Sequence, residues 1–115
     1  MIFDFIAGGT GTETAEERNC EALGLVQLQP RTLRNVENIQ LDTEFMGEPY
    51  GRPYGVAPMG MCNLIAPGAD EVISREAAHR NFPHCVSTAA SSTMETSFDH
   101  AQGRAWFQLL SLIHI

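Results

Sequence analysis

Three groups of residues in this 115-residue chain could contact a ligand, because each follows a short apolar segment typical of a β-strand. The first is Ala-Pro-Met-Gly-Met at 57–61, where small residues and a proline let the backbone approach a flat ligand. The second begins at Ser87, which supplies a hydroxyl, and the third is Gln108, whose amide both donates and accepts hydrogen bonds. No nucleophile–base–acid arrangement accompanies them. These residues alone therefore indicate a ligand-binding α/β segment and no specific reaction.

Composition excludes several classes of function. All seven basic residues are arginines, and without lysine the chain can form neither a P-loop nor a lysine Schiff base. The glycines at 8–11 do not complete a dinucleotide fingerprint, because Thr14 stands where the third glycine belongs. The net charge of −7, with scattered arginines, argues against a nucleic-acid partner.

The cysteines predict neither a disulfide framework nor a metal centre. Cys20, Cys62 and Cys85 are odd in number, and their spacing matches no zinc motif. His79 and His84 lie near Cys85, but we favour ordinary surface histidines and a buried thiol over a metal cluster. No apolar run approaches the ~20 residues of a membrane span, and the N-terminal residues do not resemble a signal peptide. We therefore expect a cytoplasmic protein with no membrane span.

The elements that must position the three groups alternate between strand and helix. An acidic helix runs to about residue 23, with a capping box at Thr10 and Glu13 or at Thr14 and Glu17. Segments 41–45 and 54–57, with a turn at 47–51, predict a hairpin that leads into a buried strand. The apolar periodicity then predicts a helix over 69–77, with Ala69, Val72, Ile73 and Ala77 on one face, followed by a strand at 86–88. A second helix is capped by Ser92 and Glu95 and carries Met94, Phe98 and Ala101 on one face. The last predicted element is a strand at 105–109.

This alternation implies parallel strands joined by right-handed helical crossovers. Ligands of such folds gather at the carboxyl ends of the strands, where the three groups lie. Three strands with two helices do not close a barrel, and an open sheet leaves two edges exposed. We therefore expect the chain to be part of a larger architecture.

Five segments, in order along the chain, resemble the FMN-dependent α-hydroxy-acid oxidase and dehydrogenase family, which includes glycolate oxidase, flavin-linked L-lactate dehydrogenase and mandelate dehydrogenase. The segments are Phe-Asp-Phe-Ile-Ala-Gly-Gly at 3–9, Pro-Arg-Thr-Leu-Arg-Asn-Val at 30–36, Val-Ala-Pro-Met-Gly-Met at 56–61, Ser-Thr-Ala-Ala-Ser-Ser-Thr-Met-Glu at 87–95 and Trp-Phe-Gln-Leu at 106–109. The resemblance covers nearly the whole chain, to about Leu109.

The resemblance implies an α/β fold, the N-terminal portion of a TIM (β/α)8 barrel, and FMN as cofactor. It implies that Pro58, Met59 and Gly60 lie against the flavin ring and that Ser87 and Gln108 hydrogen-bond its polar edge. The implied reaction oxidises an α-hydroxy acid to the α-keto acid, in a parent protein expected to be a homo-oligomer. The catalytic histidine, substrate-binding arginines, flavin lysine and phosphate-binding glycines of the family come from later strands, so no catalytic residue is expected in this chain.

Two positions depart from the family. Phe5 stands where well-known members carry a tyrosine that binds the substrate carboxylate, a hydrogen bond worth about 1.5–3 kcal/mol. Leu110 replaces a second tyrosine, and the resemblance ends there. We therefore expect an FMN hydroxy acid dehydrogenase segment at 1–109 and a non-native tail at 110–115, so that His114 is not the catalytic base.

Two other functions remain open from the sequence. One is a free-standing, non-catalytic α/β binding module. The other is a different flavin-binding or phosphate-binding TIM-barrel enzyme that shares these first strands.

Overall fold

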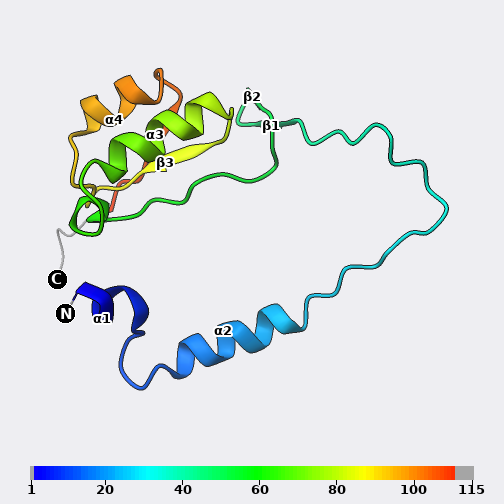
Figure 1. The fold of residues 1–115 in the computed structure, drawn as a ribbon, viewed down its shortest axis with the longest axis horizontal. Helices are drawn as coiled ribbons and strands as arrows, with labels where there is room; N and C mark the ends of the chain where they lie inside the picture. Colours follow the sequence, from blue (N-terminus) through cyan, green and yellow to red (C-terminus); the bar gives the residue numbers. More distant parts are fainter. Residues whose placement is uncertain (1, 111–115) are drawn as a thin grey trace. The chain divides into compact units, whose positions relative to one another are not determined.

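A computed structural model describes residues 2–110; Met1, residues 111–115 and the side chain of Phe5 lie outside the described part. The chain forms two compact units, Met1–Ile39 and Gln40–Ile115, and each is described by itself. Figure 1 shows both units and labels the four α-helices of the described residues and the strands β1 to β3. Much of the expected tail therefore lies outside the described residues.

The first unit contains two helices, α1 (Ile2–Ala7) and α2 (Thr14–Gly24). Helix α1 was not predicted from the sequence. The two capping boxes proposed for α2 are wrong, because the residue before the helix, Glu13, makes no side-chain cap and has a left-handed φ of 60°. Its carboxylate instead accepts a hydrogen bond from the backbone N–H of Gly9, at 3.1 Å. The described residues between α2 and the second unit form no helix or strand.

The second unit opens with a β-hairpin of two short antiparallel strands, β1 (Thr43–Phe45) and β2 (Glu48–Tyr50). The turn between them consists of Met46 and Gly47, whose φ angles of 55° and 82° suit a two-residue hairpin turn. The hairpin was predicted, but its turn was wrongly placed at 47–51, because β2 occupies most of that segment. Because the turn has only two residues, β1 pairs with β2. Segment 54–57, which was expected to pair with 41–45, therefore does not belong to the hairpin.

Segment 54–57 takes part in a small parallel sheet. Val56 forms a parallel bridge with His84, the first residue of β3 (His84–Val86). On its other side β3 pairs in parallel with β4 (Ala105–Phe107), with Val86 opposite Phe107. The predicted parallel strand order is confirmed. The strand predicted at 86–88 lies earlier in the chain, because the chain turns at Ser87, whose carbonyl accepts from the N–H of Ala90.

Gly55 permits the close approach of this first strand to β3. A Cβ atom at Gly55 would lie 2.1 Å from the carbonyl oxygen of Pro83. The next residue, Val56, donates its N–H to the same oxygen at 2.8 Å. A side chain at Gly55 would therefore push the two segments apart.

Two helices, α3 (Ala69–His79) and α4 (Met94–His100), pack against each other and against β3 and β4 (Figure 1). Small buried residues let the helices and strands approach closely: Ser74, Ala77, Ser97 and Ala101. Two residues expected on the inner faces, Val72 and Met94, are exposed instead. The predicted cap of α4 is also displaced by one residue, because Thr93 accepts the hydrogen bond from the N–H of Thr96.

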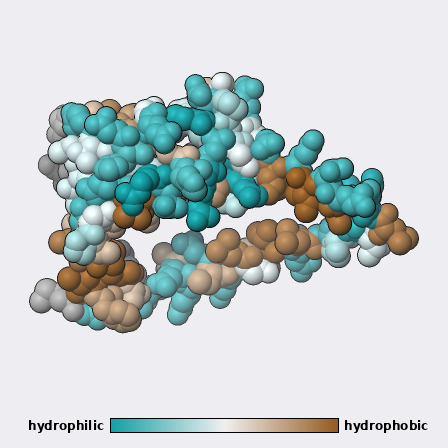
Figure 2. Space-filling model, turned by 45° about the horizontal axis from the view of Figure 1, so that its top comes forward, coloured by the Kyte–Doolittle hydropathy of each residue, from teal (hydrophilic) through white to brown (hydrophobic). Residues whose placement is uncertain are grey.

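The hydrophobic core of the described residues is small. It consists of Tyr50, Cys62, Ala77, Val86 and Ala101. Many larger hydrophobic side chains are exposed, and Figure 2 shows them as brown patches at the surface. Among residues 2–110, none of the helices has the length and apolar character needed to cross a lipid bilayer.

Candidate functional site

The carboxyl ends of β3 and β4 bring Ser87 and Gln108 together. The Ser87 hydroxyl is buried and donates a hydrogen bond to Oε1 of Gln108 at 3.2 Å. The Ser87 hydroxyl oxygen also accepts a hydrogen bond from the N–H of Ala89 at 3.1 Å, which fixes the loop after β3. The backbone N–H of Gln108 bonds the carbonyl of Val86 at 2.9 Å, so the parallel ladder continues to this residue. Ser87 and Gln108 therefore meet at the strand ends, as expected, while their role toward a cofactor stays a prediction.

Thr88 also joins the ends of β3 and β4, through hydrogen bonds to backbone groups of Gln108 and Leu110. Its hydroxyl donates to the carbonyl oxygen of Gln108 and accepts the N–H of Leu110 at 2.9 Å. Since Oε1 of Gln108 is occupied by Ser87, its side chain presents its NH2 group, which has no partner within residues 2–110. The rim therefore offers an oriented amide donor.

The loop at 57–61 lies against the loop after β3. Met61 donates its N–H to the carbonyl oxygen of Ala89 at 2.9 Å. A Cβ atom at Gly60 would lie 3.0 Å from the Cβ of Ala89, so a glycine suits this contact. Pro58 is half-buried, whereas Met59 is exposed. The structure thus joins the first and second sequence-predicted groups through Ala89.

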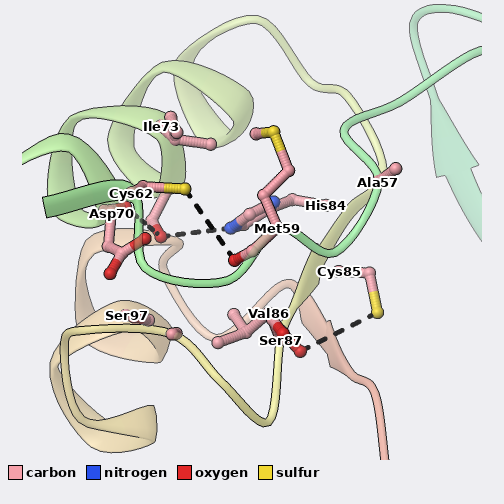
Figure 3. A pocket seen from close by; sticks show the side chains of 12 residues that line it. Ala57, Met59, Cys62, Asp70, Ile73, His84, Cys85, Val86, Ser87 and Ser97 are labelled. Atoms are coloured by element: carbon pink, nitrogen blue, oxygen red, sulfur yellow. Dashed lines mark hydrogen bonds between the residues drawn. The ribbon is translucent and has the colours of Figure 1, made fainter. Parts of the chain in front are cut away.

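A small cavity lies beneath these loops, between the sheet and α3 (Figure 3). Its volume is about 10 Å³, which is room for one water molecule and not for a cofactor. His84 lines it and is 7% exposed, so the expectation of a surface histidine is wrong at this position. Its Nε2 lies 3.2 Å from the Ser74 hydroxyl, which in turn donates to the carbonyl oxygen of Asp70 at 2.8 Å. A ligand at the rim would therefore lie outside this cavity.

Burial controls the ionisation of the groups around the cavity. It lowers the pKa of His84, although the negative charge of Asp70 acts in the opposite direction. Burial, with the charge of Asp70, raises the pKa of the Cys62 thiol. Burial also raises the pKa of Cys85. Both thiols are therefore protonated near neutral pH and make poor nucleophiles.

Asp70 is a buried polar residue that was not predicted from the sequence. Its carboxylate accepts the backbone N–H groups of Ser91 and Ser92, at 2.7 and 3.0 Å. The spacing in the sequence could have identified it: Asp70 lies one helical turn before Ser74 and two turns before Ala77, so its charge falls on the inner face of α3. A charge on an inner face predicts a partner in a neighbouring segment.

Two other sequence expectations concern Phe5 and metals. Phe5 lies in α1, in the first unit, and its side chain is outside the described part of the structure. Among the described residues no group of three or more His, Cys, Asp or Glu side chains could hold a metal ion. The three cysteines are free thiols.

Comparison with known proteins extends these observations. A sequence model described as FMN-dependent dehydrogenase matches residues 1–113. The chain is 32% identical to an L-lactate dehydrogenase from Pseudomonas syringae pv. syringae over 112 residues, which are 97% of this chain and 30% of that protein. It is 34% identical to a 4-hydroxymandelate oxidase from Amycolatopsis orientalis over 108 residues, 94% of this chain and 30% of that protein. The chain thus spans about 30% of the length of these relatives.

The solved structures agree with the sequence comparison. A mandelate oxidase variant with a monooxide FMN adduct matches with a TM-score of 0.89 and 34% identity, over 98% of this chain and 36% of that one. Mandelate oxidase with (S)-4-hydroxymandelic acid matches with a TM-score of 0.86 and 34% identity, over 94% of this chain and 30% of that one. The fold prediction is confirmed: the chain is α/β and matches about a third of a TIM barrel.

Proposed function

The chain belongs to the FMN-dependent dehydrogenase family, and from this premise we propose that it supplies one part of a flavin site in a longer protein. That longer protein, called the parent protein below, oxidises an α-hydroxy acid to the corresponding α-keto acid. The hydrogen bond between Ser87 and Gln108 carries the proposal, because it presents an oriented amide beside an open loop at the strand ends.

The residues at the rim fit the polar edge and the flat face of an isoalloxazine ring. That edge carries both donors and acceptors, and a glutamine amide with an occupied Oε1 offers its NH2 to an acceptor. Pro58, Met59 and Gly60 form a loop with one exposed apolar side chain, Met59, and no bulky group at Gly60. These residues would hold the ring, with Ser87 and Gln108 at its polar edge.

FMN, when bound, supplies the two-electron oxidation of the alcohol carbon. The substrate loses two electrons and two protons, and the proton-accepting side chain belongs to a part of the parent protein beyond this chain. Ser87 orients Gln108, while the Ala89 carbonyl holds the loop at 57–61 through the N–H of Met61. The contribution of this chain is therefore binding and orientation, not proton transfer.

We further propose that the substrate is a small-molecule 2-hydroxy acid larger than glycolate and that the parent protein is a cytoplasmic homo-oligomer. The similarity to an L-lactate dehydrogenase and to a 4-hydroxymandelate oxidase supports the substrate class. Phe5, if it faces the substrate as the tyrosine of related enzymes does, offers a ring without a hydroxyl. An aromatic side chain on the substrate would pack against it.

The test begins with the coding sequence on both sides of this chain. The parent protein, expressed whole, is expected to purify with FMN and to reduce it when a 2-hydroxy acid is added without oxygen. A panel from lactate to mandelate ranks the substrates, with D-enantiomers and 3-hydroxy acids as controls. Flavin that no 2-hydroxy acid reduces would point to a different flavin-binding barrel enzyme, and a parent protein without flavin would overturn the proposal.

A further inference from the structure

Asp70 is a buried carboxylate that contacts none of the residues assigned to the flavin. It lies at the start of α3 and is 7% exposed. A carboxylate can be buried only where hydrogen bonds replace its hydration. The N–H groups of Ser91 and Ser92 supply them, at 2.7 and 3.0 Å, across 21 and 22 residues of chain. Asp70 therefore fixes the backbone of the loop between β3 and α4.

Asn63 links the start of α3 to the same loop through two hydrogen bonds of its side-chain amide. Its Oδ1 accepts the backbone N–H of Asp70 at 3.1 Å, and its Nδ2 donates to the Ser92 hydroxyl at 3.4 Å. The Ser92 hydroxyl in turn donates to a carboxylate oxygen of Glu71. Three segments, at residues 63, 70–71 and 91–92, thus form one hydrogen-bonded unit.

The loop that Asp70 holds is also the loop that joins the two halves of the candidate site. Ala89, two residues before Ser91, donates to the Ser87 hydroxyl and accepts from the N–H of Met61. A shift of the backbone at Ser91 would therefore move Ala89. The orientation of Ser87 toward Gln108, at 3.2 Å, and the position of the Met61 loop would change together.

We propose that Asp70 is a positioning residue for the flavin site, acting through the N–H groups of Ser91 and Ser92 on the loop that carries Ala89 and Ser87. The proposal rests on the proposed function, since it needs a flavin at this rim. Asp70 does not touch the flavin; it reduces the freedom of two loops that do. Preorganisation of this kind improves affinity without a new contact.

The test compares Asp70→Asn with Glu76→Gln in the parent protein. Asn keeps the shape of the side chain and removes the charge, so its hydrogen bonds to the two N–H groups weaken. Glu76 lies on the same helix, exposed, in an i,i+4 pair with Arg80, and serves as the matched control. We expect Asp70→Asn to raise the dissociation constant for FMN about tenfold, a loss typical of one charge-assisted hydrogen bond. Its bound-flavin absorbance spectrum should shift, and Glu76→Gln should match the wild type.

Thermal unfolding of the same variants distinguishes a positioning role from a merely structural one. An Asp70→Asn protein with a lower Tm but the wild-type FMN affinity and spectrum overturns the inference and leaves the proposed function intact. If Asp70→Asn does not fold, Asp70→Glu keeps the charge but lengthens the side chain by one methylene, which displaces the carboxylate from the N–H groups of Ser91 and Ser92. A wild-type FMN affinity and bound-flavin spectrum in Asp70→Glu then overturn the inference. A wild-type parent protein that binds no FMN overturns both the inference and the proposed function.

Discussion

The hydroxyl of Ser87 donates a hydrogen bond to Oε1 of Gln108 at 3.2 Å, across the carboxyl ends of two neighbouring parallel strands. This contact sets which end of the amide faces outward. It converts two separate polar residues into one oriented donor, and the proposed flavin site depends on it.

Removing the Ser87 hydroxyl should weaken flavin binding. In Ser87→Ala the Gln108 amide loses its donor and the N–H of Ala89 loses its acceptor. We expect the dissociation constant of the parent protein for FMN to rise about tenfold, which corresponds to about 1.4 kcal/mol. Fluorescence titration measures it, with Gln27→Ala as an exposed control. Wild-type affinity in Ser87→Ala would show that the pair does not serve the flavin.

Gly55 and Gly24 make a matched pair of glycine substitutions with opposite expected signs. A Cβ at Gly55 would meet the carbonyl oxygen of Pro83 at 2.1 Å, so Gly55→Ala should lower the free energy of unfolding by about 2 kcal/mol. Gly24 ends α2 and has no atom within 4 Å of such a Cβ, so Gly24→Ala should raise it by about 0.5 kcal/mol. Urea denaturation of the parent protein measures both. Equal stability of the two variants would be inconsistent with the close approach at Gly55.

His84 should make stability depend on pH. Burial lowers its pKa in the folded protein, so the unfolded chain takes up the proton more readily. The neutral, buried His84 therefore adds to the free energy of unfolding above the ordinary histidine pKa of about 6.5. This stabilisation falls as the pH drops from there toward the lower pKa of the folded protein. Urea midpoints measured from about pH 8 to pH 5 should show this loss.

The matched variants for this pH dependence are His84→Leu and His79→Gln. His84→Leu should flatten the dependence because it removes the titrating group, whereas the exposed His79→Gln should retain it. The assignment to His84 is refuted by a slope in His84→Leu as steep as that of the wild type.

A tyrosine at position 5 should favour small substrates. If Phe5 faces the substrate carboxylate, Phe5→Tyr adds one hydrogen bond to a charged group, worth about 1.5–3 kcal/mol. We expect KM for lactate in the parent protein to fall about tenfold, with less change for mandelate. A KM for lactate that does not change would place position 5 away from the carboxylate.

The isolated 115-residue chain should bind FMN weakly. Its described residues bury only five hydrophobic side chains, and the outer edge of β4 has no strand partner among them. Hydrogen exchange should therefore show no protected core, and fluorescence titration should find no FMN affinity as tight as about micromolar. A cooperative unfolding transition with a protected core would instead favour a free-standing module.

The sequence by itself determined the family and the alternation of strands and helices after residue 54, but not helix α1 or the partner strand of the hairpin. Apolar periodicity reports which side of a segment is buried, so the strands and helices after residue 54 and the polar residues at their ends were predictable. Local hydrogen bonds were harder to predict. The box at Thr10 failed because Glu13 bonds the N–H of Gly9 instead, and the box at Thr14 failed because Thr14 lies inside α2. The site roles of Pro58, Met59, Gly60, Ser87 and Gln108 remain predictions.

Only the tertiary structure decided which polar groups meet. The bond of Ser87 to Gln108 spans 21 residues and depends on the register of β3 and β4. The bond from Asp70 to Ser91 spans the same separation and depends on how α3 lies over the loop. The residues around one partner do not reveal the other, because a hydrogen bond requires its two atoms to lie within about 3 Å in space and not near each other in sequence. Packing alone sets that distance between segments remote in sequence.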